Sequence, residues 1–379
     1  MRSIELFTGA GGLALGTQLA GFHHEALVEF NASACRTLRT NSRRGALPGI
    51  AHWQVHEADI KKFAFAPYQG VDLIAGGVPC QPFSLGGKHR GMNDERDMFP
   101  HFVRAVRELR PSAFIVENVK GLLRESFASY FSYIKLQLEH PELLPIDGEI
   151  WQDHLARLVR HHTSAPHDEL SYNVVFQLLN AADFGVPQRR ERVFIVGFRS
   201  DLGIEWNFPT PTHSRASLAR VQAIGTYWAR HEVQPRRVID AQLSINDGLK
   251  PWRTIRDVIS DLPEPVVGKP TVFNHELRLG ARSYPGHTGS DVDLPSKTLK
   301  AGVHGVPGGE NTVVMADGHV RYLTVREAAR IQTFPDSWVF EGPWGEAMRQ
   351  LGNAVPMELA RVVADSVATT MAQHKALHN

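Results

Sequence analysis

The sequence predicts an α/β fold built on a doubly wound, mostly parallel sheet, together with a second, smaller and irregular β-rich domain. Two observations lead to this prediction. Over the first two hundred residues, short apolar runs rich in β-branched side chains alternate with helical patterns, with turn residues between them. From about Arg199 onward, prolines become frequent and the regular alternation of strand and helix stops.

The runs that we expect to form strands occupy residues 3–7, 25–30, 71–75, 113–116 and 193–198, and a further strand is expected just before residue 59. The helical patterns occupy residues 13–20, 32–40, 126–138, 149–160, 324–332 and 357–372. The helices expected at 126–138 and 149–160 belong to an apparent insertion that carries no evident chemistry. We find no internal repeat and no low-complexity tract.

Composition describes an ordinary globular protein of 379 residues, with 42% hydrophobic and 21% charged residues. The 41 Lys and Arg nearly balance the 40 Asp and Glu, so a polyanionic partner would have to be bound by a local basic face. Two cysteines far apart in the sequence cannot form a disulfide framework, and we expect a reducing, cytoplasmic compartment. No signal peptide and no apolar run of membrane-spanning length is evident.

A glycine-rich turn follows the first expected strand. Its residues are Phe7-Thr8-Gly9-Ala10-Gly11-Gly12, and the first expected helix begins directly after them. Glycines there let the backbone approach a ligand closely, and a helix N-terminus favours a carboxylate or phosphate. Such a turn can also simply connect two elements, so a ligand site here needs further support.

Acidic residues at the ends of the next strands supply that support. Glu29 ends the second expected strand, where an acid can bind both hydroxyls of a ribose. Phe30 could lie against an adenine, and Asp59 could accept a hydrogen bond from its amino group. The alternative is that Glu29 and Asp59 are helix N-caps. Two acids at the correct strand ends favour a nucleoside.

Cys80 occupies an unusual setting for a cysteine. A free cysteine is ordinarily a small buried apolar residue, and Cys35, within a helical pattern, fits that description. Cys80 instead follows a buried-looking strand and lies between Pro79 and Gln81-Pro82 in a rigid turn. A thiol there is presented at the carboxyl edge of the sheet, where α/β folds bind their ligands.

Two further polar segments adjoin expected strands. Glu117 closes the strand at 113–116 and is either a cap or a carboxyl group whose pKa is raised by poor solvation, ready to give a proton. The segment Gln188-Arg189-Arg190-Glu191-Arg192 leads directly into the strand at 193–198. Such a charge run is usually a solvated face, but here some of its arginines must lie near the sheet edge.

Taken together and in this order, these segments resemble the motif set of the cytosine-5 DNA methyltransferase family. The matching segments are Phe7-x-Gly9-x-Gly11-Gly12, Pro79-Cys80-Gln81, Glu117-Asn118-Val119, Gln188-Arg189-Arg190-Glu191-Arg192, Arg326-Glu327-x-x-Arg330-x-Gln332-x-Phe334-Pro335 and Gly352-Asn353-Ala354-Val355-Pro356. They span nearly the whole chain. The stretches 124–170 and 199–295 contain no shared motif.

The resemblance implies a sheet of the S-adenosylmethionine-dependent methyltransferase type and two domains with different functions. A catalytic, cofactor-binding domain is expected from 1–198 and 336–379, with a helical insertion at 121–170. A target recognition domain is expected at 199–335. The small excess of positive charge in this second region is compatible with phosphate contacts and equally with a solvated surface.

The resemblance also implies a mechanism and its residues. Cys80 would add to C6 of a flipped-out cytosine, Glu117 would hold N3 and the exocyclic amine, and Arg190 and Arg192 would lie beside the base. The residues implied to bind S-adenosylmethionine are Phe7, Gly9, Gly11, Gly12, Glu29, Phe30, Asp59, Pro79, Asn353 and Val355. Those expected to contact DNA are Gln81, Ser84, Lys88 and Arg90. The glycine-rich stretch 86–91 is either a lid over the base or a plain surface loop, and no metal site is expected.

The implied partner is double-stranded DNA, acted on by a monomer in the bacterial cytoplasm at the nucleoid, with a cognate restriction endonuclease acting separately. Three alternatives remain open. A tRNA cytosine-5 methyltransferase of the same fold would have the same catalytic residues, and a non-catalytic DNA-binding relative would share the fold. An NAD- or FAD-dependent oxidoreductase is disfavoured because the turn lacks the Gly-x-Gly-x-x-Gly spacing.

Overall fold

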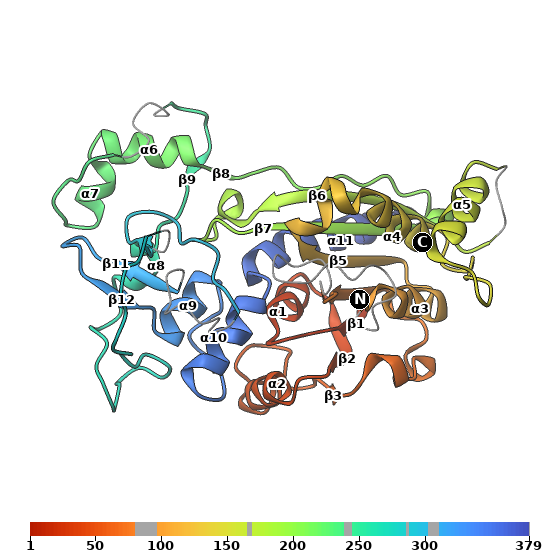
Figure 1. The fold of residues 1–379 in the computed structure, drawn as a ribbon, viewed down its shortest axis with the longest axis horizontal. Helices are drawn as coiled ribbons and strands as arrows, with labels where there is room; N and C mark the ends of the chain where they lie inside the picture. Colours follow the sequence, from red (N-terminus) through yellow and green to blue (C-terminus); the bar gives the residue numbers. More distant parts are fainter. Residues whose placement is uncertain (80–96, 165–168, 239–244, 286–287, 302–310, 379) are drawn as a thin grey trace. The chain divides into compact units, whose positions relative to one another are not determined.

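The computed structural model describes residues 1–79, 97–164, 169–238, 245–285, 288–301 and 311–378. The chain divides into two compact units (Figure 1). The sheet unit comprises Met1–Leu179, Glu191–Phe208 and Val363–Asn379, and the second unit comprises Asn180–Arg190 and Pro209–Val362. These contact-based bounds differ from those of the expected functional domains, whose assignment stays a prediction.

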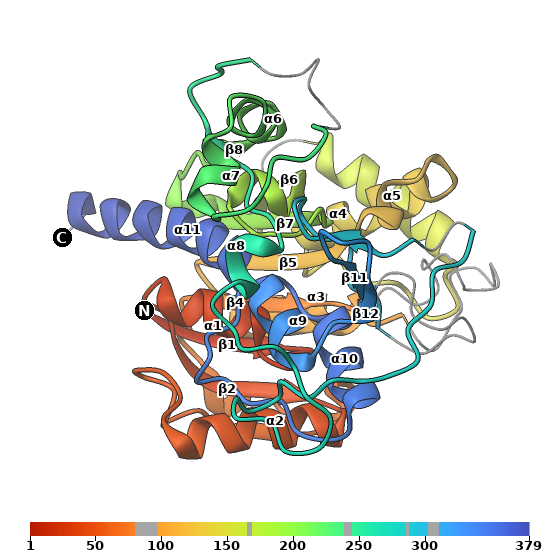
Figure 2. The same ribbon diagram turned by 90° about the vertical axis from the view of Figure 1, so that its left-hand side faces the viewer.

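A seven-stranded sheet forms the centre of the sheet unit, with the order β3-β2-β1-β4-β5-β7-β6. Its strands are β1 (Arg2–Leu6), β2 (His23–Glu29), β3 (Val55–Glu57), β4 (Leu73–Gly77), β5 (Ala113–Val119), β6 (Tyr172–Asn180) and β7 (Glu191–Arg199). The strands from β3 to β5 pair in parallel, and β7 runs antiparallel to β5. Figure 2 shows the strands stacked in this order from β2 to β6. The predicted mostly parallel α/β fold is confirmed.

Helices of the sheet unit connect and cover these strands. They are α1 (Gly12–Leu19), α2 (Ala32–Arg44), α3 (Phe99–Leu109), α4 (Ala128–Glu139) and α5 (Trp151–His162), and α11 (Met357–His378) belongs to this unit from Val363 on. Short 3-10 helices are η1 (Ile60–Lys62), η2 (Ala66–Tyr68), η3 (Lys120–Leu123), η4 (Glu125–Phe127) and η6 (Ser200–Leu202). Among the described residues, no helix has the length and apolar character needed to cross a membrane.

The middle strands are buried on both faces, which explains their nearly continuous apolar sequences. Phe114 of β5 is fully buried and lies across Gly197 of the neighbouring β7. A Cβ atom at Gly197 would lie 2.2 Å from the Phe114 ring, so only glycine fits there. Such close packing fixes the register of β5 against β7, and with it the residues at the strand ends.

The second unit is irregular, as expected, but the prediction that it is rich in β-structure is wrong, because its helices contain more residues than its short strands. Its strands are only two or three residues long: β8 (His213–Ser214), β9 (Lys250–Pro251), β10 (Ser290–Asp291), β11 (Thr312–Val314) and β12 (Val320–Tyr322). Its helices are η5 (Ala181–Phe184), α6 (Arg215–Ala223), α7 (Thr226–Arg230), α8 (Arg256–Ile259), α9 (Val325–Ile331) and α10 (Trp344–Asn353). The order β10-β11-β12 forms one small sheet, and β8 pairs with β9.

Most of the expected elements are present, with ends shifted by a few residues. The sequence analysis missed β6, α3 and α10, and it named no individual element from β8 to β12 or from α6 to α8. The β6 strand lies at the edge of the sheet and exposes Val175 and Phe176, so it lacks the inward-facing alternation of a half-buried strand. The α3 helix begins at a proline-containing first turn, which reads as a break when only the sequence is considered.

Candidate active site

The carboxyl ends of the parallel strands meet at one edge of the sheet and carry the predicted site residues of the sheet unit. Leu6 of β1 pairs with Gly76 of β4, and Gly77 pairs with Glu117 of β5. These pairings place the glycine-rich turn after β1 next to the segment that leads from β4 toward Cys80. The expectation that this edge gathers the motifs is consistent with the register of the strands.

The turn after β1 depends on left-handed backbone conformations. Gly9 has φ 57° and Gly11 has φ 95°, conformations that other residues adopt only at a cost. Phe7 is also left-handed, with φ 55°, although it is not a glycine. Strain of this kind costs about 1 kcal/mol or more and often accompanies functional sites. Gly11 is the N-cap of α1, and no side chain among the described residues caps this helix. Its first N–H groups therefore face the turn.

Glu29 ties this turn to the end of β2. Its carboxylate accepts hydrogen bonds from the backbone N–H of Gly9 at 2.8 Å and of Asn31 at 2.7 Å. The N-cap of α2 is Asn31, whose side chain accepts from the N–H groups of Ser33 and Ala34. The alternative that Glu29 is a helix N-cap is therefore wrong. A carboxylate has about four lone-pair positions, so two backbone bonds leave capacity for a ligand hydroxyl.

Phe30 and Asp59 complete this side of the edge. The Phe30 side chain is 75% exposed, an unusual position for a large apolar ring that follows a buried strand. Asp59 does act as an N-cap, because its Oδ1 accepts from the N–H of Lys61 at the start of η1. For Asp59 the capping alternative is thus correct. Its other carboxylate oxygen, Oδ2, could accept a hydrogen bond from a ligand.

Glu117 forms an ion pair with Arg192 on the adjacent strand. The distance from Arg192 Nε to Glu117 Oε1 is 2.8 Å, and both side chains are about nine-tenths buried. A Cβ atom at Gly77 would lie 3.4 Å from Glu117 Oε2 and 4.0 Å from the Phe7 carbonyl oxygen. The absence of a side chain at Gly77 therefore leaves room beside the carboxylate, at the point where the glycine-rich turn also passes.

Asn118 holds the segment that precedes Cys80. Its side-chain Nδ2 donates to the carbonyl oxygen of Val78 at 3.1 Å, and the side chain is buried. Its Oδ1 accepts from the N–H of Val119. Pro79, the next residue after Val78, is exposed at the sheet edge. Asn118 was part of a recognised motif but was not predicted as a site residue, and this contact gives it a role.

The two cysteines differ in what the structure describes. Cys35 is fully buried in α2, its Sγ donates to the Glu29 carbonyl oxygen at 3.5 Å, and burial raises the pKa of its thiol to about 12. Such a thiol is not a nucleophile at neutral pH, which agrees with the structural role predicted for Cys35. Cys80 lies outside the described residues, as do Gln81, Ser84, Lys88 and Arg90.

Arg190 has a different environment from Arg192. It belongs to the second unit, is fully buried, and donates to the carbonyl oxygens of Leu299 (3.1 Å), Gly352 (2.7 Å) and Ala354 (2.9 Å). All three acceptors are backbone atoms of its own unit. These contacts give Arg190 a framework role, whereas the sequence analysis expected it beside the base together with Arg192.

A buried polar network joins three of the motif segments within the second unit. Gln188 donates to Gln332 Oε1 at 3.0 Å and accepts from the N–H of Leu299. Gln332 in turn donates to the carbonyl oxygen of Leu351. Gly352 packs so closely that a Cβ atom there would lie 2.2 Å from the Ala301 nitrogen. The late motifs therefore form the internal frame of this unit.

A match to a known protein family separates the methyltransferase alternatives from the oxidoreductase alternative. The family model described as C-5 cytosine-specific DNA methylase matches residues 1–141 and 163–369.

The chain belongs to this family.

Accordingly it is a DNA (cytosine-5-)-methyltransferase, and the oxidoreductase alternative is wrong.

Curated relatives of this methyltransferase match over nearly its whole length. The type II methyltransferase M.Eco47II of Escherichia coli is 32% identical over 378 residues, covering 96% of this chain and 78% of the relative. M.NgoMIV of Neisseria gonorrhoeae, also a type II methyltransferase, is 32% identical over 370 residues. This match covers 96% of this chain and 96% of the relative.

Solved structures share the fold. A structure described as a prophage-encoded DNA modification methyltransferase of E. coli has a TM-score of 0.61 at 20% identity, over 98% of this chain and 99% of that one. The S. pombe Dnmt2 methyltransferase has a TM-score of 0.57 at 17% identity, over the same shares of the two chains. At these identities the likeness concerns the fold alone.

Several polar residues of the late methyltransferase motifs serve the framework. Arg326 is buried and donates to the carbonyl oxygen of Trp338 at 2.8 Å. Glu327 forms a capping box with Thr324 and binds Arg321 through both oxygens, at 2.6 and 2.7 Å. Asn353 is exposed and Val355 is buried in the second unit. Their assignment to the cofactor stays a prediction.

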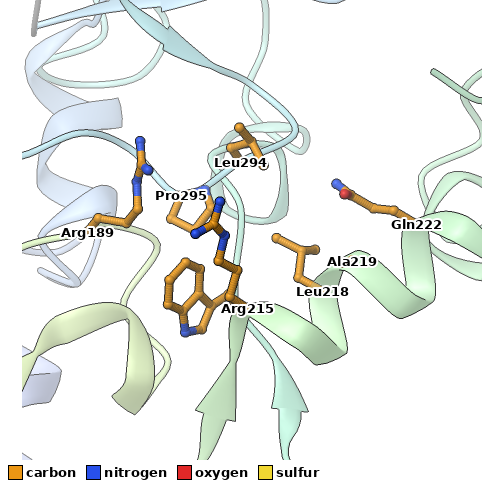
Figure 3. A pocket seen from close by; sticks show the side chains of 8 residues that line it. Arg189, Arg215, Leu218, Ala219, Gln222, Leu294 and Pro295 are labelled. Carbon is orange, nitrogen blue, oxygen red and sulfur yellow. The ribbon is translucent and has the colours of Figure 1, made fainter. Parts of the chain in front are cut away.

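The second unit of the methyltransferase also contains a pocket of about 80 Å³ with two arginines in its wall. Figure 3 shows side chains that line it, drawn from the segment before β7, from α6 and from the segment after β10. The lining residues are Arg189, Arg215, Leu218, Ala219, Gln222, Trp252, Leu294 and Pro295. Arg189 is exposed, and the sequence analysis did not single it out, although it stands in a recognised motif.

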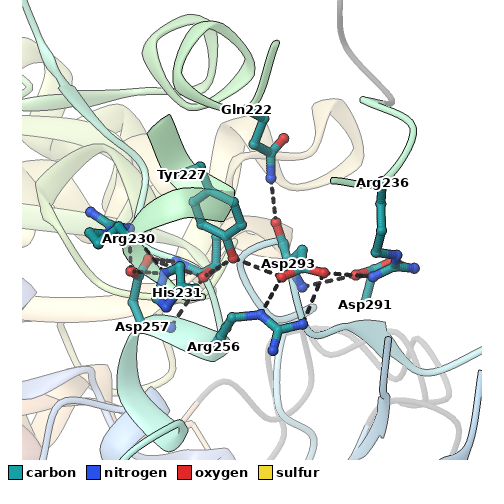
Figure 4. A network of polar contacts seen from close by, with 10 residues as sticks. Gln222, Tyr227, Arg230, His231, Arg236, Arg256, Asp257, Asp291 and Asp293 are labelled. Atoms are coloured by element: carbon teal, nitrogen blue, oxygen red, sulfur yellow. Dashed lines mark hydrogen bonds and ion pairs between the residues drawn. The ribbon is translucent and has the colours of Figure 1, made fainter. Parts of the chain in front are cut away.

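Close to this pocket, Asp293 organises the small helices of the second unit (Figure 4). Its carboxylate accepts from Arg256 at 2.5 Å, from Arg236 at 2.6 Å and from the Tyr227 hydroxyl at 2.9 Å. Burial raises the pKa of Asp293, but the hydrogen bonds from Arg256 and Arg236 outweigh burial, and the pKa lies below its ordinary value. The Asp293 carbonyl oxygen accepts from Gln222 of α6, so the pocket wall is anchored to the same centre.

Proposed function

We propose that this enzyme transfers the methyl group of S-adenosylmethionine to C5 of a flipped-out cytosine in a specific duplex DNA sequence, through a covalent adduct between Cys80 and C6. The observation that carries the proposal is the buried Glu117–Arg192 pair, which lies beside Gly77 at the strand end that leads to Cys80. It supplies a carboxylate fixed by a cation next to the expected position of the thiol.

The residues at the sheet edge fit the cofactor. An exposed Phe30 ring suits an adenine face, the Glu29 carboxylate suits the ribose hydroxyls, and Asp59 suits the adenine amino group. Phe7, Gly9, Gly11, Gly12 and Pro79 would line the remainder of the site. S-adenosylmethionine, when bound there, supplies the methyl group. Burial of Phe30 by the adenine would remove an apolar ring from water, which is favourable for binding.

The nucleophile is assigned to Cys80 by chemistry and by elimination. Cytosine C5 is a poor nucleophile until a thiolate adds to C6 and places electron density on C5. The sequence has two cysteines, and the buried Cys35 thiol, with a pKa of about 12, cannot supply the thiolate. Cys80 remains, two residues after Val78, whose carbonyl oxygen accepts from Asn118.

Glu117 and Arg192 would manage the charge that this addition creates. As the sulfur–C6 bond forms, the C5–C6 electron pair moves toward C5 and N3, and a proton held on N3 by Glu117 neutralises it. Arg192 fixes the orientation of the Glu117 carboxyl group and offsets negative charge. After C5 gains the methyl group, its proton leaves to a base or water, the C5–C6 double bond re-forms, and the Cys80 thiolate departs.

DNA recognition is assigned to the second unit. Extrusion of the target base costs roughly a few kcal/mol and requires contacts elsewhere on the duplex. The pocket with Arg189 and Arg215 offers two guanidinium groups, which suit phosphate oxygens or the acceptor atoms of guanine in the major groove. Residues 199–301 would contribute the remaining sequence readout, and Lys88 and Arg90 would contact the DNA near the flipped base.

The biological setting follows from the relatives. Because the E. coli and N. gonorrhoeae relatives are named type II methyltransferases, we propose that this enzyme is the modification partner of a separate restriction endonuclease. It would act as a monomer on double-stranded DNA in the bacterial cytoplasm, at the nucleoid. Bisulfite sequencing of DNA from cells that express the enzyme would give the recognition sequence directly.

Covalent trapping tests the mechanism and the substrate together. The enzyme is incubated with S-adenosylmethionine and a duplex containing 5-fluorocytosine at the site found by bisulfite sequencing, because fluorine cannot leave C5 as a proton does. We expect a stable protein–DNA adduct, mapped by mass spectrometry to Cys80, with wild type and with Cys35→Ser. Cys80→Ala should give no adduct and no methyl transfer while it still binds the cofactor.

Two outcomes would contradict the proposal. An adduct on another residue, or full activity of Cys80→Ala, would exclude Cys80 as the nucleophile. Transfer of a radiolabelled methyl group to tRNA, with none to duplex DNA, would replace the DNA assignment by the tRNA alternative.

A further inference from the structure

The ends of α4 and α5 bring together five side chains that can bind a metal, away from the catalytic edge. The α4 helix ends at Glu139 with His140 as its C-cap, and α5 ends with His161 and His162. Glu169 lies on the segment that leads into β6. The insertion was expected to carry no evident chemistry, and no metal site was predicted from the sequence.

Three of these side chains lie close enough together to bind one metal ion. One ring nitrogen of His140, one of His161 and one carboxylate oxygen of Glu169 all lie within 4.8 Å of one another. His161 Nε2 contacts Glu169 Oε1, and the rings of His140 and His161 have centroids 4.9 Å apart at a steep angle. All three residues are partly buried, which favours one defined geometry over a set of mobile surface side chains.

Two further side chains extend the cluster. His162 Nδ1 lies 3.0 Å from His140 Nε2 and 3.8 Å from Glu139 Oε2. Glu139 is 6% exposed, and its Oε1 is bound by Lys135 at 2.6 Å. Its Oε2 is buried and has no hydrogen-bond partner among the described residues. A buried carboxylate oxygen without a hydrogen bond is costly, and a cation bound at the imidazoles would add to the compensation that Lys135 gives this carboxylate.

Helix geometry adds to the negative potential at this place. The last carbonyl groups of a helix carry a partial negative charge, and both α4 and α5 end at the cluster. A cation is therefore favoured by two carboxylates and by two helix C-termini. Imidazole nitrogens with one carboxylate oxygen suit Zn²⁺, which takes four ligands in a tetrahedron.

We infer that His140, His161 and Glu169 bind one zinc ion, with the fourth position open to His162 or a water molecule. Glu139 orients the histidines from the buried side, as carboxylates commonly do next to metal-bound imidazoles. The ion links the end of α4, the end of α5 and the entry to β6, and so stabilises the insertion. The role is structural and independent of the proposed methyl transfer.

Part of the proposed site lies outside the match to the family model. The family model matches residues 1–141 and 163–369, so the segment that contributes His161 and His162 lies outside the match. A zinc ion here would fix a segment that the family model does not match.

Zinc binding by the full-length enzyme tests the inference. Protein stripped with a chelator and dialysed is titrated with Zn²⁺ in competition with a chromophoric chelator, and Co²⁺ is then used as a spectroscopic probe. We expect one Zn²⁺ per chain, a tetrahedral Co²⁺ absorption band and a higher melting temperature with Zn²⁺. Binding should weaken as the pH falls, because metal-bound histidines must be unprotonated.

Matched variants make the result specific. His161→Ala and Glu169→Gln should each weaken Zn²⁺ binding by at least about tenfold, while His52→Ala, at an exposed histidine elsewhere in the sheet unit, should bind as wild type does. Glu169→Gln keeps the size of the side chain, and circular dichroism would show that it folds. Equal binding by His161→Ala, Glu169→Gln and wild type, or a Co²⁺ spectrum without a tetrahedral band, would overturn the inference.

Discussion

Asn118 lies next to Glu117, the carboxyl group of the proposed mechanism, and its side chain contacts the backbone. Its side chain donates to the Val78 carbonyl, two residues before Cys80 in the sequence. Glu117, its neighbour in β5, is fixed in turn by Arg192. These two contacts fix adjacent residues of β5 at the strand end that leads toward Cys80, and under the proposed mechanism small displacements there can cost much of the rate.

Replacement of Asn118 should slow methyl transfer more than it weakens cofactor binding. We expect Asn118→Ala to lower kcat by about tenfold to a hundredfold, because the Val78 carbonyl loses its donor and Cys80 loses its position. The cofactor Kd, measured by calorimetry, should change little. Asn173→Ala, at an exposed asparagine of β6, serves as control. A parallel loss of affinity and rate, or an unchanged kcat, would refute the positioning role.

At the scale of elements, the packing of α1 on the sheet depends on a buried histidine. His24 of β2 is bonded to the Ala14 carbonyl oxygen at 2.9 Å and to Ser3 Oγ at 3.1 Å. Burial lowers the pKa of His24 from 6.5 to about 4. Glu5 of β1 is buried in the same layer, and burial raises its pKa well above the ordinary value. The two groups therefore affect stability in opposite directions as the pH falls.

The His24 effect can be isolated by substitution. Between pH 6.5 and 4 the unfolded chain binds a proton at His24 that the folded chain does not, so stability falls with pH by up to about 3 kcal/mol. Above pH 6.5 this residue contributes no pH dependence. We expect His24→Gln to be less stable at pH 7 but to lose less stability toward pH 4, as measured by urea unfolding. An equally steep loss in the variant would rule out His24 as the cause.

The strand ends could be predicted from the sequence better than the framework could. Glu29, Glu117 and the glycine-rich turn lie at strand ends, as predicted, because each closes or follows an apolar run. Parallel strands bring such ends together. The burial of Arg190 among backbone carbonyls was not predicted, because a charge run does not reveal which guanidinium faces inward. Its burial depends on carbonyl groups more than a hundred residues away, at Leu299 and Gly352. The cluster of His140, His161 and Glu169 was also missed, because the sequence does not show that the ends of α4 and α5 lie together.

At the scale of the whole molecule, the net charge is only +1, so DNA binding must rely on local arginines. The pocket with Arg189 and Arg215 is one such concentration of positive charge. It lies in the second unit, whose irregular strands are held together by the Asp293 centre and the Gln188–Gln332 network. The sequence indicated an irregular domain of this kind but not which arginines it exposes.

Neutralising either pocket arginine should weaken DNA binding in a salt-dependent manner. We expect Arg189→Ala and Arg215→Ala each to reduce affinity for the recognition duplex, and a phosphate contact to lower the slope of log affinity against log salt by about 1. Arg44→Ala, at an exposed arginine of α2 in the sheet unit, is the control. Fluorescence anisotropy at several salt concentrations gives the slope. Affinities equal to wild type would remove this pocket from the DNA interface.

The buried contacts of Arg190 and Gln188 set a rule for building chimeras of this enzyme. In a chimera, a foreign segment inserted before Ala301 must keep two backbone contacts at position 299. The carbonyl of this residue accepts from Arg190, and its N–H donates to Gln188. Grafts that rejoin the host upstream of Leu299 keep this junction intact. Grafts that replace this junction would leave the buried Arg190 guanidinium without its acceptor at position 299. Such proteins should be insoluble, whatever DNA sequence the foreign segment recognises.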